Sequence, residues 1–140
     1  MLNMSKVLDI LAAQLNPVVG DINGNLALAR EAYAEARERD ADLLVLSELF
    51  ILGYPAEDLV LKPSAVTLSM AAVETLAGET ADGPAILIGA PWRDGDKVHN
   101  SSVLLKDGHV AGRCDKRELP NYGVFDEKRI FDAGTGAPFV

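Results

Sequence analysis

Short apolar runs alternate with amphipathic segments over about the first 90 residues, and this alternation limits the folds that the chain can adopt. Residues 43–46 form a continuous apolar run, which is typical of a strand covered on both faces of a sheet. Residues 7–15 and 85–89 are predicted to form two more strands. Strands that alternate with helices usually pair in parallel, so the sequence predicts an α/β fold.

Two helices are expected between these strands. Asn23 or Asn25 can cap the first helix, which is predicted to run to about Arg39. Its apolar residues are spaced 3, 4 and 3 apart, as on one face of a helix: Leu26, Ala29, Tyr33 and Ala36. The second helix follows Pro63, and its apolar residues also repeat at helical spacing: Val66, Met70, Val73 and Ala77.

After Pro91 the pattern changes from helical to hairpin-like. Residues 98–105 and 109–116 are strand candidates joined through Asp107-Gly108, a dipeptide typical of tight hairpin turns. The predicted order is therefore β-α-β-α-β followed by an antiparallel pair, in a mixed sheet with helices on at least one face. Residues 133–140 are expected to form a loop that leads into another strand.

Charge and composition argue against several classes of protein. A net charge of −8 and a pI near 4.6 are unlike a surface that binds nucleic acid or an anionic membrane. No apolar run approaches the roughly 20 residues that span a bilayer, and residues 1–6 do not resemble a signal peptide. The single cysteine excludes an internal disulfide framework and a zinc knuckle. A cytoplasmic protein of single-domain size is expected from these 140 residues.

Glu48 and Lys116 are the first candidate catalytic residues. Glu48 directly follows the strand at 43–46, and open α/β sheets place their sites at the carboxyl ends of strands. A carboxylate there can act as a general base, although a solvated loop glutamate would look the same. Lys116 ends the second hairpin strand, where its ammonium group could stabilise an oxyanion. Without further information, a surface lysine paired with Asp115 or Glu118 is the simpler interpretation.

Cys114 lies two residues before Lys116, so on a strand the two side chains would share a face. This placement makes the thiol a candidate nucleophile. A single free cysteine is more often a small buried hydrophobe, and that interpretation is preferred here. His99 and His109 have no second ligand at metal-binding spacing, so both are expected to be ordinary strand or turn residues.

The residues that follow Lys116 are open to more than one interpretation. Tyr122 and Phe125 could pack in the core or line a pocket. Residues 126–129 form a mixed charge run, which is usually a solvated face. Glu127 would be notable if it pointed inward.

Several motifs of the chain resemble those of one enzyme superfamily. Residues 13–21 (AQLNPVVGD) and 43–55 (LLVLSELFILGYP) are similar to motifs of the nitrilase superfamily, the carbon–nitrogen hydrolases. Lys116 with residues 119–127 (LPNYGVFDE) resembles a more particular branch, the glutaminase domains of glutamine-dependent NAD⁺ synthetases, and residues 54–59 also suit that branch. The resemblance covers essentially the whole chain. It implies that residues 1–140 are the amino-terminal portion of an α-β-β-α sandwich that is truncated here.

The resemblance also implies roles for individual residues. Glu48 would be the general base that activates the nucleophile, and Lys116 would stabilise the tetrahedral intermediate. Tyr122 would help to bind L-glutamine, and Glu127 would be a supporting carboxylate near the lysine. In this family a cysteine thiolate attacks the side-chain amide of glutamine, ammonia leaves, and water hydrolyses the thioester to glutamate.

The chain departs from the family pattern at the nucleophile. The family's cysteine belongs on a later strand, beyond Val140, whereas Cys114 precedes the lysine and does not match it. The synthetase domain, which would use ATP, Mg²⁺ and deamido-NAD⁺, is also absent from the 140 residues. No cofactor is expected for the glutaminase step, and the complete enzyme is expected to be a homo-oligomer. We therefore expect no glutaminase activity from this chain alone.

Two other interpretations remain open on the sequence. The chain could belong to another nitrilase-superfamily enzyme, such as an aliphatic amidase or a carbamoylase. It could also be a non-catalytic module that serves only in assembly. The run at 119–127 favours the NAD⁺ synthetase branch over other amidases.

Overall fold

A computed structural model describes residues 7–136 of the chain. The strands are β1 (Ile10–Ala12), β2 (Leu43–Val45), β3 (Ala85–Asp94), β4 (Lys97–Lys106) and β5 (His109–Asp115), and they form one sheet in the order β1-β2-β3-β4-β5. The first three strands are parallel, and β3, β4 and β5 pair antiparallel. This arrangement confirms the predicted α/β fold and its mixed sheet.

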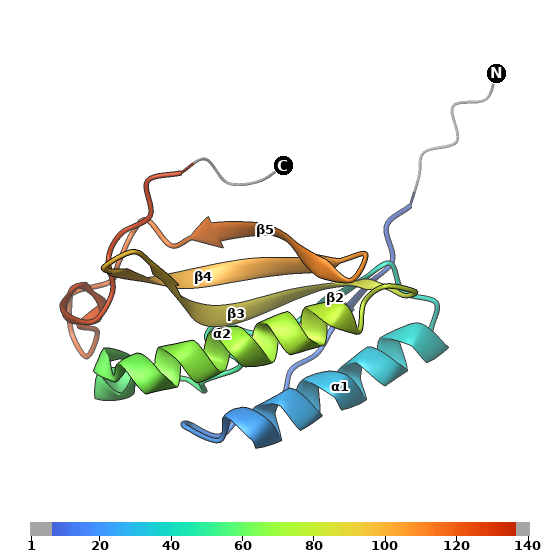
Figure 1. Cartoon of the computed structure of the whole chain (residues 1–140), viewed down its shortest axis with the longest axis horizontal. Helices are drawn as coiled ribbons and strands as arrows, with labels where there is room; N and C mark the ends of the chain where they lie inside the picture. Colours follow the sequence, from blue (N-terminus) through green and yellow to red (C-terminus); the bar gives the residue numbers. More distant parts are fainter. Residues whose placement is uncertain (1–6, 137–140) are drawn as a thin grey trace.

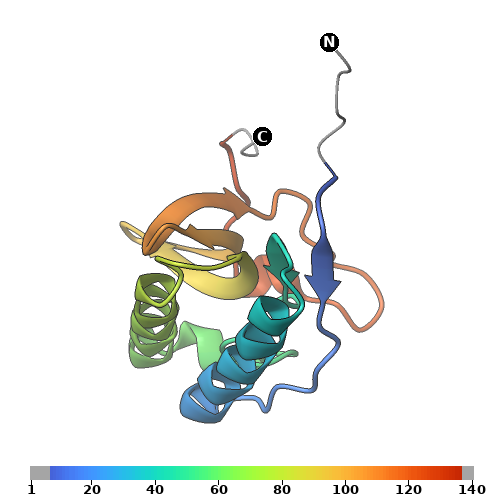
Figure 2. The same ribbon diagram turned by 90° about the vertical axis from the view of Figure 1, so that its right-hand side faces the viewer.

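Helices α1 (Ile22–Glu38) and α2 (Pro63–Gly78) connect the parallel strands. The two crossovers step in the same direction across the sheet, and crossovers of one hand then place their helices on the same face. Figures 1 and 2 show both helices on one side of the sheet. Alternate strand residues point into this layer, so the core lies between the helices and one face of the sheet.

The start of α1 differs from the prediction. The helix is capped by Asp21, whose Oδ1 accepts a hydrogen bond from the backbone N of Gly24 at 3.0 Å. Asn25 is instead buried in the first turn, where its side chain bonds both backbone groups of Val18 and the carbonyl of Ile51. The predicted caps, Asn23 and Asn25, were therefore wrong. The predicted apolar stripe of α1 is confirmed, since all four of its residues are buried.

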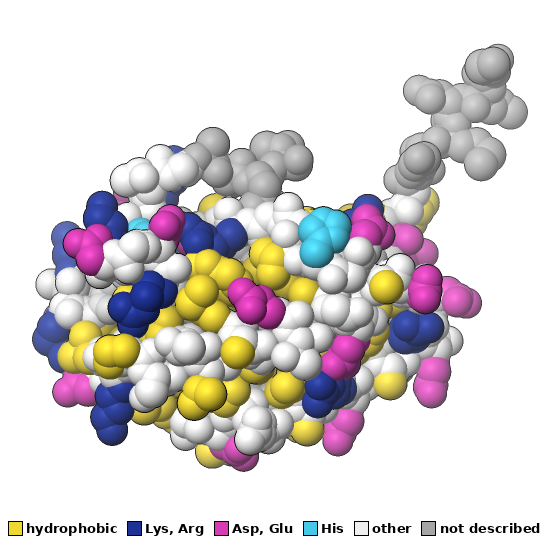
Figure 3. All heavy atoms as spheres, viewed as in Figure 1, with side chains coloured by type: hydrophobic (Ala, Val, Ile, Leu, Met, Phe, Trp, Pro, Cys, Tyr) yellow, Lys and Arg dark blue, Asp and Glu magenta, His cyan; other side chains and the backbone are white. Residues whose placement is uncertain are grey.

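The predicted stripe of α2 is largely confirmed, with Val66, Val73 and Ala77 buried and Met70 half-buried. Pro63 stands in the first turn, where its missing N–H costs no helical bond. A short 3₁₀ helix, η1 (Glu57–Leu61), precedes α2. Hydrophobic side chains reach the surface on the face seen in Figure 3, interspersed with charged side chains of both signs.

The hairpin between β4 and β5 forms where the sequence predicts it. Asp107 and Gly108 have φ values of 53° and 82°, and two successive positive φ values are what a type I′ hairpin turn requires. The first strand is shorter than the predicted residues 7–15, because only Ile10–Ala12 pair with β2. Residues 133–136 carry no helix or strand, and residues 137–140 of the expected further strand lie outside the described residues.

The expectation that residues 43–46 are covered on both faces of the sheet was wrong for the described residues. Leu44 points into the helix layer and is fully buried, whereas Leu43 and Val45 point to the opposite face and are only half-buried. On that opposite face Ile10 of β1 is also exposed. The described residues thus form one helix layer and one sheet layer of the expected four-layer sandwich. We call the side of the sheet away from the helices the open face.

Two further features follow from residues 7–136. No helix among them is long and apolar enough to cross a membrane. The same residues contain no group of three or more His, Cys, Asp and Glu side chains placed to hold a metal ion.

Candidate active site

Glu48 stands in a tight turn at the end of β2, and a glycine on β3 makes this turn possible. A Cβ atom on Gly89 would lie 2.3 Å from the N of Leu49 and 2.5 Å from the O of Ser47, so the turn passes directly over the glycine. Gly89 N also donates to the carbonyl of Ser47 at 3.2 Å. Leu49 has a φ of 49°, a strained value for a bulky residue, and such strain often accompanies functional sites.

Lys116 follows the last residue of β5 and reaches back to this turn. Its backbone N donates to the carbonyl of Asn100 on β4 at 2.8 Å, which extends the ladder of strand hydrogen bonds by one residue. Its Nζ donates to Oε1 of Glu48 at 2.8 Å and to Oε1 of Glu127 at 3.0 Å. The structure therefore brings together three of the four predicted site residues: Glu48, Lys116 and Glu127.

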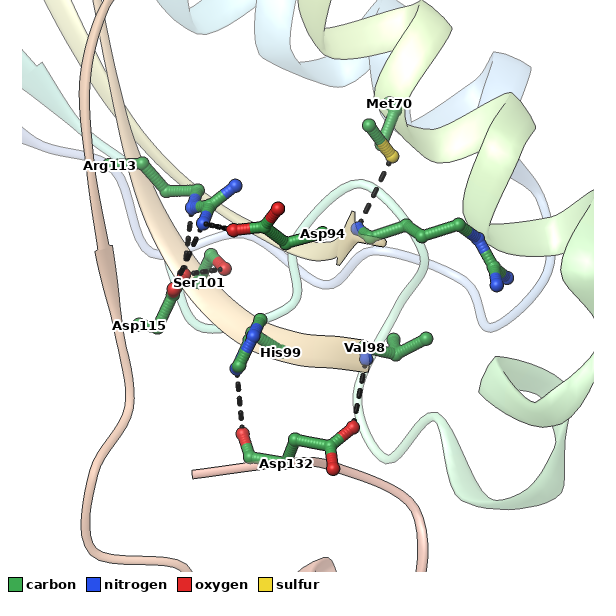
Figure 4. A network of polar contacts seen from close by, with 9 residues as sticks. Met70, Asp94, Val98, His99, Ser101, Arg113, Asp115 and Asp132 are labelled. Atoms are coloured by element: carbon green, nitrogen blue, oxygen red, sulfur yellow. Dashed lines mark hydrogen bonds and ion pairs between the residues drawn. The ribbon is translucent and has the colours of Figure 1, made fainter. Parts of the chain in front are cut away.

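Glu127 points inward because the loop after Lys116 is fixed at its far end. This residue begins a short 3₁₀ helix, η2 (Glu127–Arg129), and its backbone N donates to the carbonyl of Pro120 at 3.1 Å. The loop then returns to β4, where Val98 N donates to Oδ2 of Asp132 and His99 Nδ1 donates to the carbonyl of Asp132, both at 2.9 Å (Figure 4). Glu127 is consequently only 7% exposed, which answers the open question about its direction.

The site contains one ammonium group, on Lys116, and two carboxylates, on Glu48 and Glu127. Partial burial lowers the pKa of Lys116, but its hydrogen bonds to Glu48 and Glu127 and the negative charges of these carboxylates outweigh this effect and raise the pKa above its ordinary value. Lys116 is therefore a cation at neutral pH, as an oxyanion stabiliser must be. The simpler interpretation, a surface lysine paired with Asp115 or Glu118, is wrong.

Glu48, Lys116 and Cys114 line one cavity of about 330 Å³ on the open face, so the cysteine and the lysine do face the same space. Cys114 is half-buried and lies opposite Ser102 in the β4–β5 pair. Asn100 also lines this cavity and donates from Nδ2 to Oε1 of Glu48 at 2.6 Å. Sequence reasoning missed Asn100 and Gly89, because each acts through a contact with a residue distant in the chain.

Tyr122 lies apart from the three charged groups. Its side chain is 72% exposed, and its ring meets Phe125 edge to face with centroids 5.7 Å apart. Phe125 and Tyr54 line a second cavity of about 560 Å³, into which Glu127 also faces. Oε2 of Glu127 is buried and has no hydrogen-bond partner among the described residues. A ligand with an N–H donor would satisfy this oxygen.

The two histidines are not placed for metal chemistry. His99 is buried and bonded to the backbone of Asp132, as Figure 4 shows, and His109 bonds the carbonyl of Asp107 in the hairpin turn. Both are strand residues, as the sequence predicts.

Glu48, Lys116 and Glu127 thus lie in contact at the carboxyl ends of β2 and β5 in a mixed α/β sheet. The family model for carbon–nitrogen hydrolases matches residues 10–140, and the chain belongs to this family.

Within the family, the chain is similar to glutamine-dependent NAD⁺ synthetases. The synthetase of Rhodobacter capsulatus is 46% identical over 125 residues, which cover 89% of this chain and 23% of that protein. The synthetase of Thermotoga maritima is 44% identical over 130 residues, which cover 92% of this chain and 22% of that protein. The chain thus spans less than a quarter of the length of these relatives.

Solved structures agree with the sequence comparison. Glutamine-dependent NAD⁺ synthetase from Acinetobacter baumannii superimposes with a TM-score of 0.86 and 37% identity, over 92% of this chain and 24% of that one. An amidase of the nitrilase superfamily from Nesterenkonia AN1 gives a TM-score of 0.81 and 29% identity, over 94% of this chain and 50% of that one. These matches confirm the nitrilase-like fold.

Proposed function

We propose that this chain supplies the general base and the oxyanion-stabilising lysine of a glutaminase that releases ammonia from L-glutamine for NAD⁺ synthesis. The observation that carries the proposal is the position of Lys116 Nζ, 2.8 Å from Glu48 and 3.0 Å from Glu127. An amide hydrolase needs a base beside its nucleophile and a fixed cation beside the carbonyl oxygen, and this group of residues provides both.

In the proposed reaction, a cysteine thiol gives its proton to the Glu48 carboxylate and attacks the side-chain carbonyl of glutamine. The carbonyl oxygen becomes an oxyanion, which the Lys116 ammonium group stabilises. The carbon–nitrogen bond then breaks, and the proton held by Glu48 passes to the leaving nitrogen, so that ammonia and a thioester result. Water hydrolyses the thioester to glutamate and restores the thiol.

The other residues have supporting roles in this proposal. Glu127 holds Lys116 through a second ion pair, and Tyr122 contributes to glutamine binding. Cys114 is not the nucleophile, because the family's cysteine follows the lysine in the chain and Cys114 precedes it. No cofactor takes part in the glutaminase step.

The wider activity is proposed from the names of the relatives. Ammonia would pass to a synthetase domain that uses ATP and Mg²⁺ to convert deamido-NAD⁺ to NAD⁺, in a cytoplasmic homo-oligomer. The relatives that are 46% and 44% identical are both glutamine-dependent NAD⁺ synthetases, which supports this branch over a general amidase. The convergence of Lys116 and two carboxylates beside a cavity favours a catalytic site over a purely structural assembly module.

A chimera tests the proposal. Residues 10–140 of this chain would replace the matching segment of the Thermotoga maritima synthetase, and NAD⁺ formation would be measured with glutamine and, separately, with ammonium chloride as the nitrogen source. We expect both sources to support NAD⁺ formation. A chimera that uses ammonium but not glutamine would contradict the proposed role of this chain.

A further inference from the structure

Asn100 contacts both members of the Glu48–Lys116 pair. Its side-chain Nδ2 donates to Oε1 of Glu48 at 2.6 Å, and its backbone carbonyl accepts from the N of Lys116 at 2.8 Å. The residue is only 4% exposed. Since a carboxylate oxygen can only accept, the side-chain group of Asn100 that faces it must be the NH₂.

The backbone of β4 fixes Asn100 independently of its side chain. Because its carbonyl bonds Lys116, its peptide groups face β5 and not β3. The residue opposite on β3 is Pro91, which has no N–H to offer and is tolerated at such a position for that reason. Asn100 is thus held rigidly between two strands, and its side chain is directed to the open face beside Glu48.

The two oxygens of Glu48 have different surroundings. Oε1 accepts from both Lys116 and Asn100, whereas no hydrogen bond to Oε2 is found within residues 7–136. Lys116 also pairs with Glu127, so its ammonium group does not hold Glu48 alone. The amide of Asn100 adds a second anchor without adding charge, and the other oxygen stays free to accept a proton.

We propose that Asn100 is the positioning residue of this site: its side chain orients the carboxylate of Glu48 and its carbonyl fixes the chain at Lys116. The role rests on the proposed glutaminase function, because orientation of a base matters only to a reaction that uses one. Asparagine is suited to the position. Aspartate would repel Glu48, and leucine of similar size has no donor.

A spectroscopic experiment on this chain tests the contact without any need for activity. In the ¹⁵N-labelled protein, one Nδ2 proton of Asn100 is expected to resonate downfield of its partner and to exchange slowly with solvent. Glu48→Ala should abolish both properties, and Glu127→Gln should preserve them. An Asn100 signal that does not respond to Glu48→Ala would overturn the proposal.

A kinetic experiment on the chimera tests the consequence. Asn100→Leu and Asn100→Asp are expected to lower kcat for glutamine hydrolysis by on the order of 10- to 100-fold, with little change in KM. The matched control is Ser101→Ala. Ser101 is the next residue on β4 and is equally buried, but its hydroxyl donates to Oδ1 of Asp115 on the opposite face at 2.6 Å, as Figure 4 shows.

The outcomes separate this proposal from the glutaminase proposal. If Ser101→Ala lowers kcat as much as Asn100→Leu, Asn100 has only a structural role. If the chimera hydrolyses glutamine but neither Asn100 variant lowers kcat, the positioning role is wrong while the proposed function stands. A chimera without glutamine hydrolysis contradicts the proposed function, and the positioning role of Asn100 with it.

Discussion

The Nζ atom of Lys116 lies 2.8 Å from Oε1 of Glu48, although 68 residues separate the two in the chain. Glu48 follows a parallel strand, β2, and Lys116 follows an antiparallel strand, β5, so the contact depends on the whole sheet between them. A contact of this kind forms only in the folded chain.

The first prediction concerns the pH dependence of the Lys116 ion pairs. The pKa of Lys116 is raised above its ordinary value of 10.5 because, although burial lowers it, its bonds to Glu48 and Glu127 raise it more. The stabilisation from these pairs is therefore fully present below about pH 10.5 and is lost as the pH rises through the raised pKa. The difference in unfolding free energy between the wild type and Lys116→Met should stay constant from neutral pH to about pH 10 and then shrink. Chemical denaturation over this range measures it, and a difference that disappears between pH 7 and about pH 9 would be inconsistent with the raised pKa.

The second prediction concerns Gly89 beneath the Glu48 turn. Gly89→Ala should destabilise the chain by about 1–3 kcal/mol, because the new methyl group would collide with backbone atoms of residues 47–49. Gly78, the last residue of α2, is the matched control, since a Cβ atom there meets nothing within 4 Å. Gly78→Ala should leave stability unchanged or raise it by up to about 1 kcal/mol. If Gly89→Ala and Gly78→Ala changed the unfolding free energy equally in urea denaturation, the turn at Glu48 would not require a glycine at position 89.

The third prediction concerns Asn25, which ties two loops to α1. Asn25→Ala removes the bonds of a buried side chain to Val18 and Ile51 and leaves the buried carbonyl of Ile51 without its side-chain donor, so a loss of about 2–4 kcal/mol is expected. Asn23→Ala, two residues earlier and exposed, should change stability by no more than about 0.5 kcal/mol. The stabilities of the two variants are compared by their thermal unfolding midpoints. A harmless Asn25→Ala would mean that these loops do not depend on its side chain.

These cases show which features the sequence could predict. The order of strands and helices followed from local patterns, such as the apolar spacing in α1 and the Asp107-Gly108 turn. The cap of α1 did not, because the burial of Asn25 depends on its contact with Ile51, 26 residues away. The coverage of residues 43–46 was also misjudged, since an apolar run does not tell which face a helix layer covers.

Some features of the candidate site could likewise be predicted from the sequence, and others could not. Glu48 and Lys116 could be selected from strand ends and motif resemblance, but their contact could not be derived from spacing. The inward direction of Glu127 depends on Asp132, which fixes the loop to β4 through hydrogen bonds with Val98 and His99. Asn100 belongs to no motif that reasoning from the sequence selected, and only the paired strands bring it to Glu48.

The fourth prediction concerns the single cysteine. The chain alone should show no glutamine hydrolysis, because Cys114 precedes the lysine and does not match the family's nucleophile. Cys114→Ala should accordingly leave the glutaminase activity of the chimera intact. Ammonia release by the isolated chain that disappears on Cys114→Ala would reverse this assignment and make Cys114 the nucleophile.

The most direct test of the account is the rate of glutamine hydrolysis by the chimera that carries Glu48→Gln. Glutamine has nearly the shape of glutamate and can still accept a bond from Lys116, but it cannot take the proton of a thiol. We expect kcat to fall by at least about 100-fold while ammonium-supported NAD⁺ formation is unchanged. A Glu48→Gln chimera that hydrolyses glutamine at the unsubstituted rate would contradict the assignment of Glu48 as the general base.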